Sequence, residues 1–159
     1  MDERNESGHP FIAACPCGSC RVGLDHLPRE RFLCHCTICQ RVYNSDFADA
    51  TIMLARHVEV LTPDRMTYTR HKAPPVLDRG TCSQCGHPVA GFLKVPGIGE
   101  LAFVPMSVLP REASALPPRR HIHYGTRVRD VADDLPKTDG ELASTLVLAP
   151  AILRVALRG

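Results

Sequence analysis

The 159-residue chain has no Trp and only five Phe and three Tyr residues. Its 19 Lys and Arg residues nearly balance 17 Asp and Glu residues, which gives a formal net charge of +2. Nonspecific nucleic-acid binding needs a basic surface, and single strands are held on interleaved aromatic side chains. We therefore expect no nucleic-acid partner, and the charge indicates no strongly acidic partner either.

Long apolar runs are also missing, because no stretch reaches the roughly 18 residues that a membrane-spanning helix needs. The first residues, MDERNES, are polar and acidic, and no apolar secretory segment follows them. We therefore expect a cytoplasmic protein with no membrane partner, in a compartment where thiols stay reduced. In that setting the eight Cys residues, which form three clusters, favour metal binding over disulfides.

Length and composition fit one domain with a core, since 44% of the residues are hydrophobic. We expect a disordered tail at 1–10, a zinc-binding domain at 11–138 and an apolar, helical extension at 139–159. β-Branched and alternating segments dominate, so the fold class should be mainly β, with short antiparallel sheets and little helix. The expected strands are 11–14, 21–24, 31–33, 47–54, 58–61, 66–69, 89–93 and 100–104, with a helical turn or loop at 40–44.

The stretch Cys34-His35-Cys36-Thr37-Ile38-Cys39 packs three thiols into six residues. Side chains two positions apart leave the same face of a strand, and a C-x-x-C turn lets two sulfurs hold one ion. A structural zinc takes four protein ligands, whereas a catalytic zinc keeps its fourth position for water or substrate. The pattern therefore favours an open, catalytic zinc bound by Cys34, Cys36 and Cys39.

Histidines offer an alternative fourth ligand. Strand alternation points His35 away from the flanking thiols, which favours a partly exposed or hydrogen-bonded neighbour of the site over a ligand. In the alternative, His35, His71 or His121 completes a second site that is purely structural. His121 and His123 could also ligate a metal at strand spacing, but a satisfied surface pair is the simpler interpretation.

Two further Cys clusters flank the central one. Cys82-Ser83-Gln84-Cys85-Gly86 offers two ligands, and its Gly suits the turn of a zinc knuckle, where φ is often positive. A tetrathiolate must take two more from the first cluster, either Cys15 with Cys17 or Cys17 with Cys20. A closed site of four thiols and an open site of three leave one thiol spare, which favours two unlike zinc ions.

The three clusters, taken in order, resemble the glutathione-dependent formaldehyde-activating enzyme family over Phe11 to Pro136. The motifs that carry the resemblance are Cys15-x-Cys17-Gly18, Cys34-His35-Cys36-x-x-Cys39, Cys82-x-x-Cys85-Gly86, His121-Ile122 and Asp134-Leu135-Pro136. The resemblance implies a zinc-clamped all-β fold called the β-tent. It also implies a structural zinc on Cys15, Cys17, Cys82 and Cys85, an open zinc on Cys34, Cys36 and Cys39, and Cys20 as the spare thiol.

The chain departs from the family pattern after the central motif. Where a basic pair is usual, this sequence has Gln40-Arg41, so one anchor for a substrate carboxylate is missing and Arg41 is the one that remains. Where Gly commonly follows, Asn44 stands here. That change is mild, because Asn tolerates the left-handed conformation well.

The founding activity of the family joins formaldehyde to glutathione and gives S-hydroxymethylglutathione. The resemblance thus implies a zinc-dependent carbon–sulfur lyase that condenses formaldehyde or another aldehyde with glutathione or a similar thiol. An open thiolate zinc fits this chemistry, since it can lower a thiol pKa or polarise an aldehyde oxygen. The alternative from another class is a non-catalytic, zinc-stabilised binding module for a protein partner.

The tail beyond the resemblance shows helical spacing of apolar residues. Leu142, Leu146, Ala149, Leu153 and Ala156 form the stripe. A proline at position 150 should kink or split this helix. We expect the stripe to pack on its own domain, with a dimer contact as the alternative, so the protein is a monomer or a homodimer.

Overall fold

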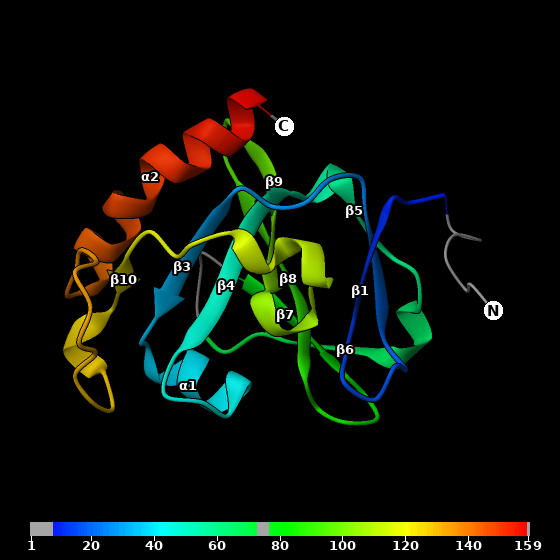
Figure 1. Cartoon of the computed structure of the whole chain (residues 1–159), viewed down its shortest axis with the longest axis horizontal. Coiled ribbons are helices and arrows are strands. Elements are labelled where there is room, and N and C mark those ends of the chain that lie inside the picture. The colour runs from blue at the N-terminus through cyan, green and yellow to red at the C-terminus, as the bar shows by residue number, and fades with distance from the viewer. Residues whose placement is uncertain (1–7, 73–76, 159) are drawn as a thin grey trace.

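The computed structural model describes residues 8–72 and 77–158. Two sheets form the body of the molecule, and a long C-terminal helix, α2, runs along its outside (Figure 1). The smaller sheet has the order β1-β2-β5, and its strands are β1 (Phe11–Ala14), β2 (Arg21–Leu24) and β5 (Val58–Val60). Both strand pairs in it are antiparallel.

The larger sheet has seven strands in the order β10-β3-β4-β9-β8-β7-β6. Their bounds are β3 (Glu30–Cys34), β4 (Ala48–Leu54), β6 (Met66–Thr69), β7 (Leu77–Cys82), β8 (Pro88–Val95), β9 (Gly99–Pro105) and β10 (His121–Ile122). All neighbours pair antiparallel except β10 and β3, which are parallel.

Helical segments connect the strands. The α-helices are α1 (Thr37–Tyr43) and α2 (Glu141–Arg158), and the 3₁₀ turns are η1 (Ala55–His57), η2 (Pro63–Arg65), η3 (Met106–Val108), η4 (Arg111–Ala115) and η5 (Tyr124–Thr126). None of the helices within the described residues combines the length and apolarity of a membrane-spanning helix.

The mainly β prediction is confirmed. Two details of the larger sheet differ from the expectation. The strand β7 was not expected, because Asp78, Arg79 and Gly80 interrupt its apolar pattern. The parallel pairing of β10 departs from the antiparallel expectation, since a two-residue strand returning from far along the chain leaves no local signal.

Buried residues form two clusters on the two faces of β4. Ala50, Ile52 and Leu54 belong to one cluster, whereas Met53 belongs to the other, as the period of two in a strand dictates. The first cluster joins the smaller sheet to the larger one and includes the buried thiols of Cys15, Cys20 and Cys82. The second cluster includes Cys34, Cys39 and one residue of α2, Ala151.

The helix α2 packs on its own domain, but with a different face from the expected one. Its inner face holds Val147, Leu148, Ala151, Ile152 and Val155. The expected stripe is largely the outer face. Its three leucines, 142, 146 and 153, are exposed. Spacing alone misled here because both faces of this helix carry apolar residues at helical intervals.

The helix is also not split at Pro150, which lies inside it. A proline removes one backbone donor and crowds the carbonyl four residues earlier, here that of Leu146. Both residues are exposed, so this carbonyl lies on the side of the helix that faces solvent, where water can replace the missing donor. Packing of the opposite face keeps the remaining turns together.

The expected tail at 1–10 is described only from Gly8 onward, so most of it lies outside the described residues. His9 is placed against the smaller sheet, where its ring contacts Asp25 at 3.0 Å and Glu59 at 2.7 Å. The ring also covers Gly23, where a Cβ atom would clash with it. This contact lies next to the start of β1, the first strand of the fold.

Candidate metal centres

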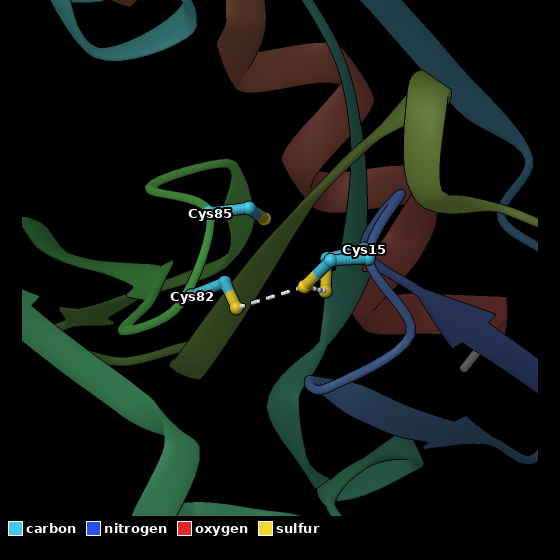
Figure 2. A group of neighbouring side chains, drawn as sticks. Cys15, Cys82 and Cys85 are labelled. Carbon is cyan, nitrogen blue, oxygen red and sulfur yellow. Dashed lines mark hydrogen bonds between the residues drawn. The ribbon is translucent and has the colours of Figure 1, made fainter.

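Two turns bring four thiols together at one end of the first buried cluster. Cys15 and Cys17 lie in the turn between β1 and β2, whereas Cys82 and Cys85 lie in the turn between β7 and β8. All four sulfurs lie within 4.8 Å of one another. Figure 2 shows the Cys15, Cys82 and Cys85 side chains pointing toward one another from these separate segments.

Both turns have the backbone of a zinc knuckle. Gly18 and Gly86 follow the second Cys of each pair and take φ values of 77° and 71°, which a side chain would disfavour. The Gly18 amide donates to the Cys15 carbonyl, and the Gly86 amide donates to the Cys82 carbonyl. The positive φ expected after the third cluster is therefore present. These turns aim both thiols of each pair to the same side.

The donor set fits a closed metal site. The Cys17 sulfur lies 3.4 Å from that of Cys15 and 3.7 Å from that of Cys82, distances typical of ligands that share an ion. Hydrogen bonds from Ser19 lower the pKa of Cys17 to about 6, which favours the thiolate that a metal requires. This group could hold a metal ion with four sulfur ligands.

Cys20 lies beside this group but outside it. Its thiol donates to the carbonyl of Arg65 at 2.8 Å, and its side chain is fully buried. Burial raises the pKa of Cys20 to about 12, so the thiol stays protonated. Of the two pairs left open by spacing, the structure thus groups Cys15 with Cys17.

A second group of thiols forms where β3 passes into α1. Cys34 ends β3, Cys36 is the N-cap of α1, and Cys39 lies in its first turn. Their sulfurs also lie within 4.8 Å of one another. Among the described residues no fourth His, Cys, Asp or Glu side chain joins them, so a metal ion here would keep a vacant position.

The electrostatics of this group favour a thiolate. The Cys36 sulfur accepts a hydrogen bond from the Cys39 amide at 3.3 Å. Hydrogen bonds from the Cys34 and Cys39 thiols lower the pKa of Cys36 to about 2. The hydrogen bond between Cys34 and Cys36 raises the pKa of Cys34. These hydrogen bonds favour the thiolate form of Cys36, which is the form that binds a metal.

His35 lies between two thiols of this group but points into a separate chain of polar residues. Its Nε2 lies 2.8 Å from Nδ1 of His121, and Nε2 of His121 lies 2.9 Å from a carboxylate oxygen of Asp133. A carboxylate can only accept, so His121 donates to Asp133 and accepts from His35. The expectation of a hydrogen-bonded neighbour is met, but both rings are buried, and His121 is not on the surface.

The backbone carbonyl of His35 is also hydrogen-bonded. Its carbonyl accepts from Nε2 of Gln40 at 2.7 Å and from the hydroxyl of Thr126 at 2.9 Å. The Gln40 amide also donates to the Thr126 carbonyl. Gln40, which stands where the family usually has a basic residue, thus holds the loop that carries the thiols in place. Asn44 ends α1 with φ 46°, the left-handed conformation expected of it.

A cavity of about 430 Å³ opens beside the three-thiol group. Most of its wall is apolar and comes from α1 and the second buried cluster, with Phe32, Ile38, Val42, Leu93 and Phe103 among the lining side chains. The polar lining residues include Lys72, Arg79, Thr126, His123 and Glu141. The chain therefore offers a pocket for a small organic molecule, with charged side chains in its wall.

Arg41 does not line this cavity. It lies on the exposed side of α1, whereas Arg79 on β7 and Lys72 do line it. The sequence reasoning missed Arg79 because an isolated Arg in a short strand carries no signal. Lys72 belongs to the exposed basic trio with Arg70 and His71, but it forms an ion pair with Glu141 of α2.

The model of the family described as "Glutathione-dependent formaldehyde-activating enzyme" matches residues 10–126. The chain belongs to this family. The matched range includes all three Cys clusters. It ends before Asp133 and α2.

A comparison with solved structures finds a similar fold. A crystal structure of a Rhodobacter sphaeroides protein from structural genomics superposes with a TM-score of 0.52 at 18% identity, covering 80% of this chain and 99% of that one. At this identity the likeness concerns the fold alone. No curated protein matches the sequence.

Proposed function

We propose that the protein is a zinc-dependent carbon–sulfur lyase that condenses formaldehyde or another aldehyde with glutathione or a similar thiol. The observation that carries the proposal is the unequal pair of thiol groups. One group has four sulfurs and is complete, whereas the other has three and faces a cavity. Zinc sites with three protein ligands and a vacant position are mostly catalytic.

The thiols Cys34, Cys36 and Cys39 would hold the open zinc, and Cys15, Cys17, Cys82 and Cys85 the structural one. Sulfur-only donor sets of this spacing select zinc among the common divalent ions. When bound in the open site, zinc lowers the pKa of a substrate thiol or polarises an aldehyde oxygen. The structural site ties the β1–β2 turn to the β7–β8 turn and so stabilises the fold.

The reaction is an addition without any redox change. The sulfur of the substrate thiol bonds to the aldehyde carbon, the carbon–oxygen double bond becomes single, and the thiol proton ends on the new hydroxyl. The reverse reaction breaks the same carbon–sulfur bond, which is the lyase direction. The largely apolar wall of the cavity would surround the reacting carbon with few competing polar groups.

Glutathione carries two carboxylates, and the cavity offers cations for them. Arg79 presents a planar guanidinium suited to a carboxylate, and Lys72 adds a second positive charge. Glu141 partly neutralises Lys72. We therefore assign the main substrate anchor to Arg79, with Arg41 outside the cavity as a weaker, longer-range contributor.

The proposal is tested by exchange NMR on formaldehyde with glutathione, with and without the zinc-loaded protein. We expect faster interconversion of free and adduct signals with the wild type and none above buffer with Cys36→Ser. Further aldehydes and thiols should follow in the same assay. A folded, zinc-loaded protein that accelerates none of these pairs would instead support a non-catalytic binding module.

A further inference from the structure

The outer face of α2 is an uncovered apolar stripe. Of the six large hydrophobic side chains that are exposed among the described residues, four are leucines of this helix. Leu142, Leu146, Leu153 and Leu157 are 74%, 62%, 55% and 78% exposed. Their positions fall within roughly 60° of the helix circumference at 100° per residue, opposite the face that packs on the domain. Scattered exposed leucines are ordinary, but an aligned row of four marks a contact surface.

The stripe is symmetric about the middle of the helix. Leu142 and Leu157 lie equally far from the point between Ala149 and Pro150, and so do Leu146 and Leu153. A two-fold dimer uses the same patch on both copies. In an antiparallel pair each position faces the position reflected about the midpoint, so a stripe with this symmetry places leucine opposite leucine. Leu142 of one copy then faces Leu157 of the other, and Leu146 faces Leu153.

The small residues at the midpoint and the charges at the ends support the same arrangement. Ala149 and Pro150 flank the stripe where two helices would approach most closely, and neither has a long side chain to hold them apart. Glu141 begins the helix and Arg158 ends it. Antiparallel pairing brings an acidic end toward a basic end and opposes the two helix dipoles, whereas parallel pairing would bring like ends together.

No charge interrupts the stripe itself. Arg154 is the only charged residue between the two ends of α2, and its side chain is held by Glu30 on β3. The helix spans about 27 Å, so its whole outer face is available for a second helix of the same length. Figure 1 shows that α2 runs along the outside of the molecule.

We propose that two copies of this chain form a two-fold dimer through antiparallel pairing of their α2 helices along Leu142, Leu146, Leu153 and Leu157. The proposal is independent of the catalytic activity. It has a consequence for the cavity, since Glu141 lines it and begins α2. The C-terminal end of α2 of the second copy would lie near the Glu141 end of the first, so the dimer brings a basic helix end close to the cavity.

The test is the molar mass of the zinc-loaded full chain by light scattering and sedimentation over a concentration series. We expect twice the 17.5 kDa of the chain, and a single-chain mass for the Leu146→Glu/Leu153→Glu variant. Val128→Glu is the matched control, because Val128 is also exposed but lies outside the helix. It should remain a dimer, and the melting temperatures should show that all three proteins are folded.

Photo-crosslinking tests the direction of pairing. A benzophenone side chain replacing Leu157 should link to the segment around Leu142 of the second copy. Links to the segment around Leu157 itself would overturn the antiparallel arrangement. A wild type that is monomeric at every concentration, including one that then binds lipid vesicles or another protein, would overturn the dimer, as would a dimer that survives Leu146→Glu/Leu153→Glu.

Discussion

His35 and His121 are 86 positions apart, yet the Nε2 of His35 lies 2.8 Å from the Nδ1 of His121, and both side chains are buried. This contact joins the loop that carries the three-thiol group to β10, the strand that pairs parallel with β3. Asp133 completes the chain through the other nitrogen of His121. The orientation of the thiol loop therefore depends on a carboxylate near the C-terminal helix.

Removing the Asp133 charge should weaken the fold in a pH-dependent way. Hydrogen bonds from Lys137 and His121 lower the pKa of Asp133 to about 2. An unfolded Asp has a pKa of about 3.9. This carboxylate therefore stabilises the fold above about pH 4, and the stabilisation is lost as the pH falls toward about 2. Asp133→Asn should therefore melt several degrees lower than the wild type at pH 7.

The difference in melting temperature between the wild type and Asp133→Asn should narrow as the pH falls below about 4. Thermal unfolding followed by circular dichroism measures this difference. Asp130→Asn is the control, because Asp130 forms only an exposed ion pair with Arg127. It should change neither the melting temperature nor its pH dependence. A constant gap from pH 7 to pH 2 would show that the effect of Asp133→Asn is not electrostatic.

The two thiol groups should respond differently to loss of one sulfur. Cys82→Ser removes a thiol from the closed group, where a bound metal would join two distant turns, so we expect unfolding or aggregation. Cys36→Ser removes a ligand from the open group at the cavity and should leave the circular dichroism spectrum close to that of the wild type. Equal unfolding of both variants would refute the division into structural and open sites.

Substrate binding should depend on Arg79 more than on Arg41. A charge-assisted hydrogen bond contributes about 1.5–3 kcal/mol, so Arg79→Gln should raise KM for glutathione at least ~10-fold. The value of kcat should change much less, because the anchor binds substrate and transition state alike. Arg41→Gln is the matched control, and screening by solvent should limit its effect to about twofold. The reverse order would place the anchor on α1.

The ion pair between α2 and β3 should contribute to stability. Glu30 is 5% exposed, and Arg154 donates to it at 2.7 Å, with Arg119 as a second partner at 3.4 Å. Arg154→Met leaves a buried carboxylate with a weaker partner and should lower the free energy of unfolding measured with denaturant. Adding Glu30→Gln should recover part of the loss, and Arg158→Met should have little effect. No recovery would argue that the loss arises from packing instead.

The sequence allowed most strands and all three Cys clusters to be predicted, because these features are local. Short apolar and β-branched segments indicated β1, β2 and β4, and C-x-C and C-x-x-C spacings located the thiols. The polar chain through His121 and Asp133 was missed because its members meet only in three dimensions. His121 was interpreted as a surface residue for the same reason.

The outer face of α2 shows a second kind of limit. Three of its four leucines were part of the stripe found from the sequence, but that stripe was expected to face the domain. Helical spacing identifies a stripe and not what covers it, and a second apolar row at Val147, Ala151 and Val155 competes for the same role. Only the packed structure decides between them.

The central claim is that activity resides in the open zinc and stability in the closed one. Its most direct test is a titration of the metal-free protein with zinc, following the formaldehyde–glutathione exchange rate against zinc bound per chain. The closed site should fill first, so the rate should stay at the buffer value up to one equivalent and rise between one and two equivalents. Full activity at one equivalent, or a rate independent of zinc, would contradict the account.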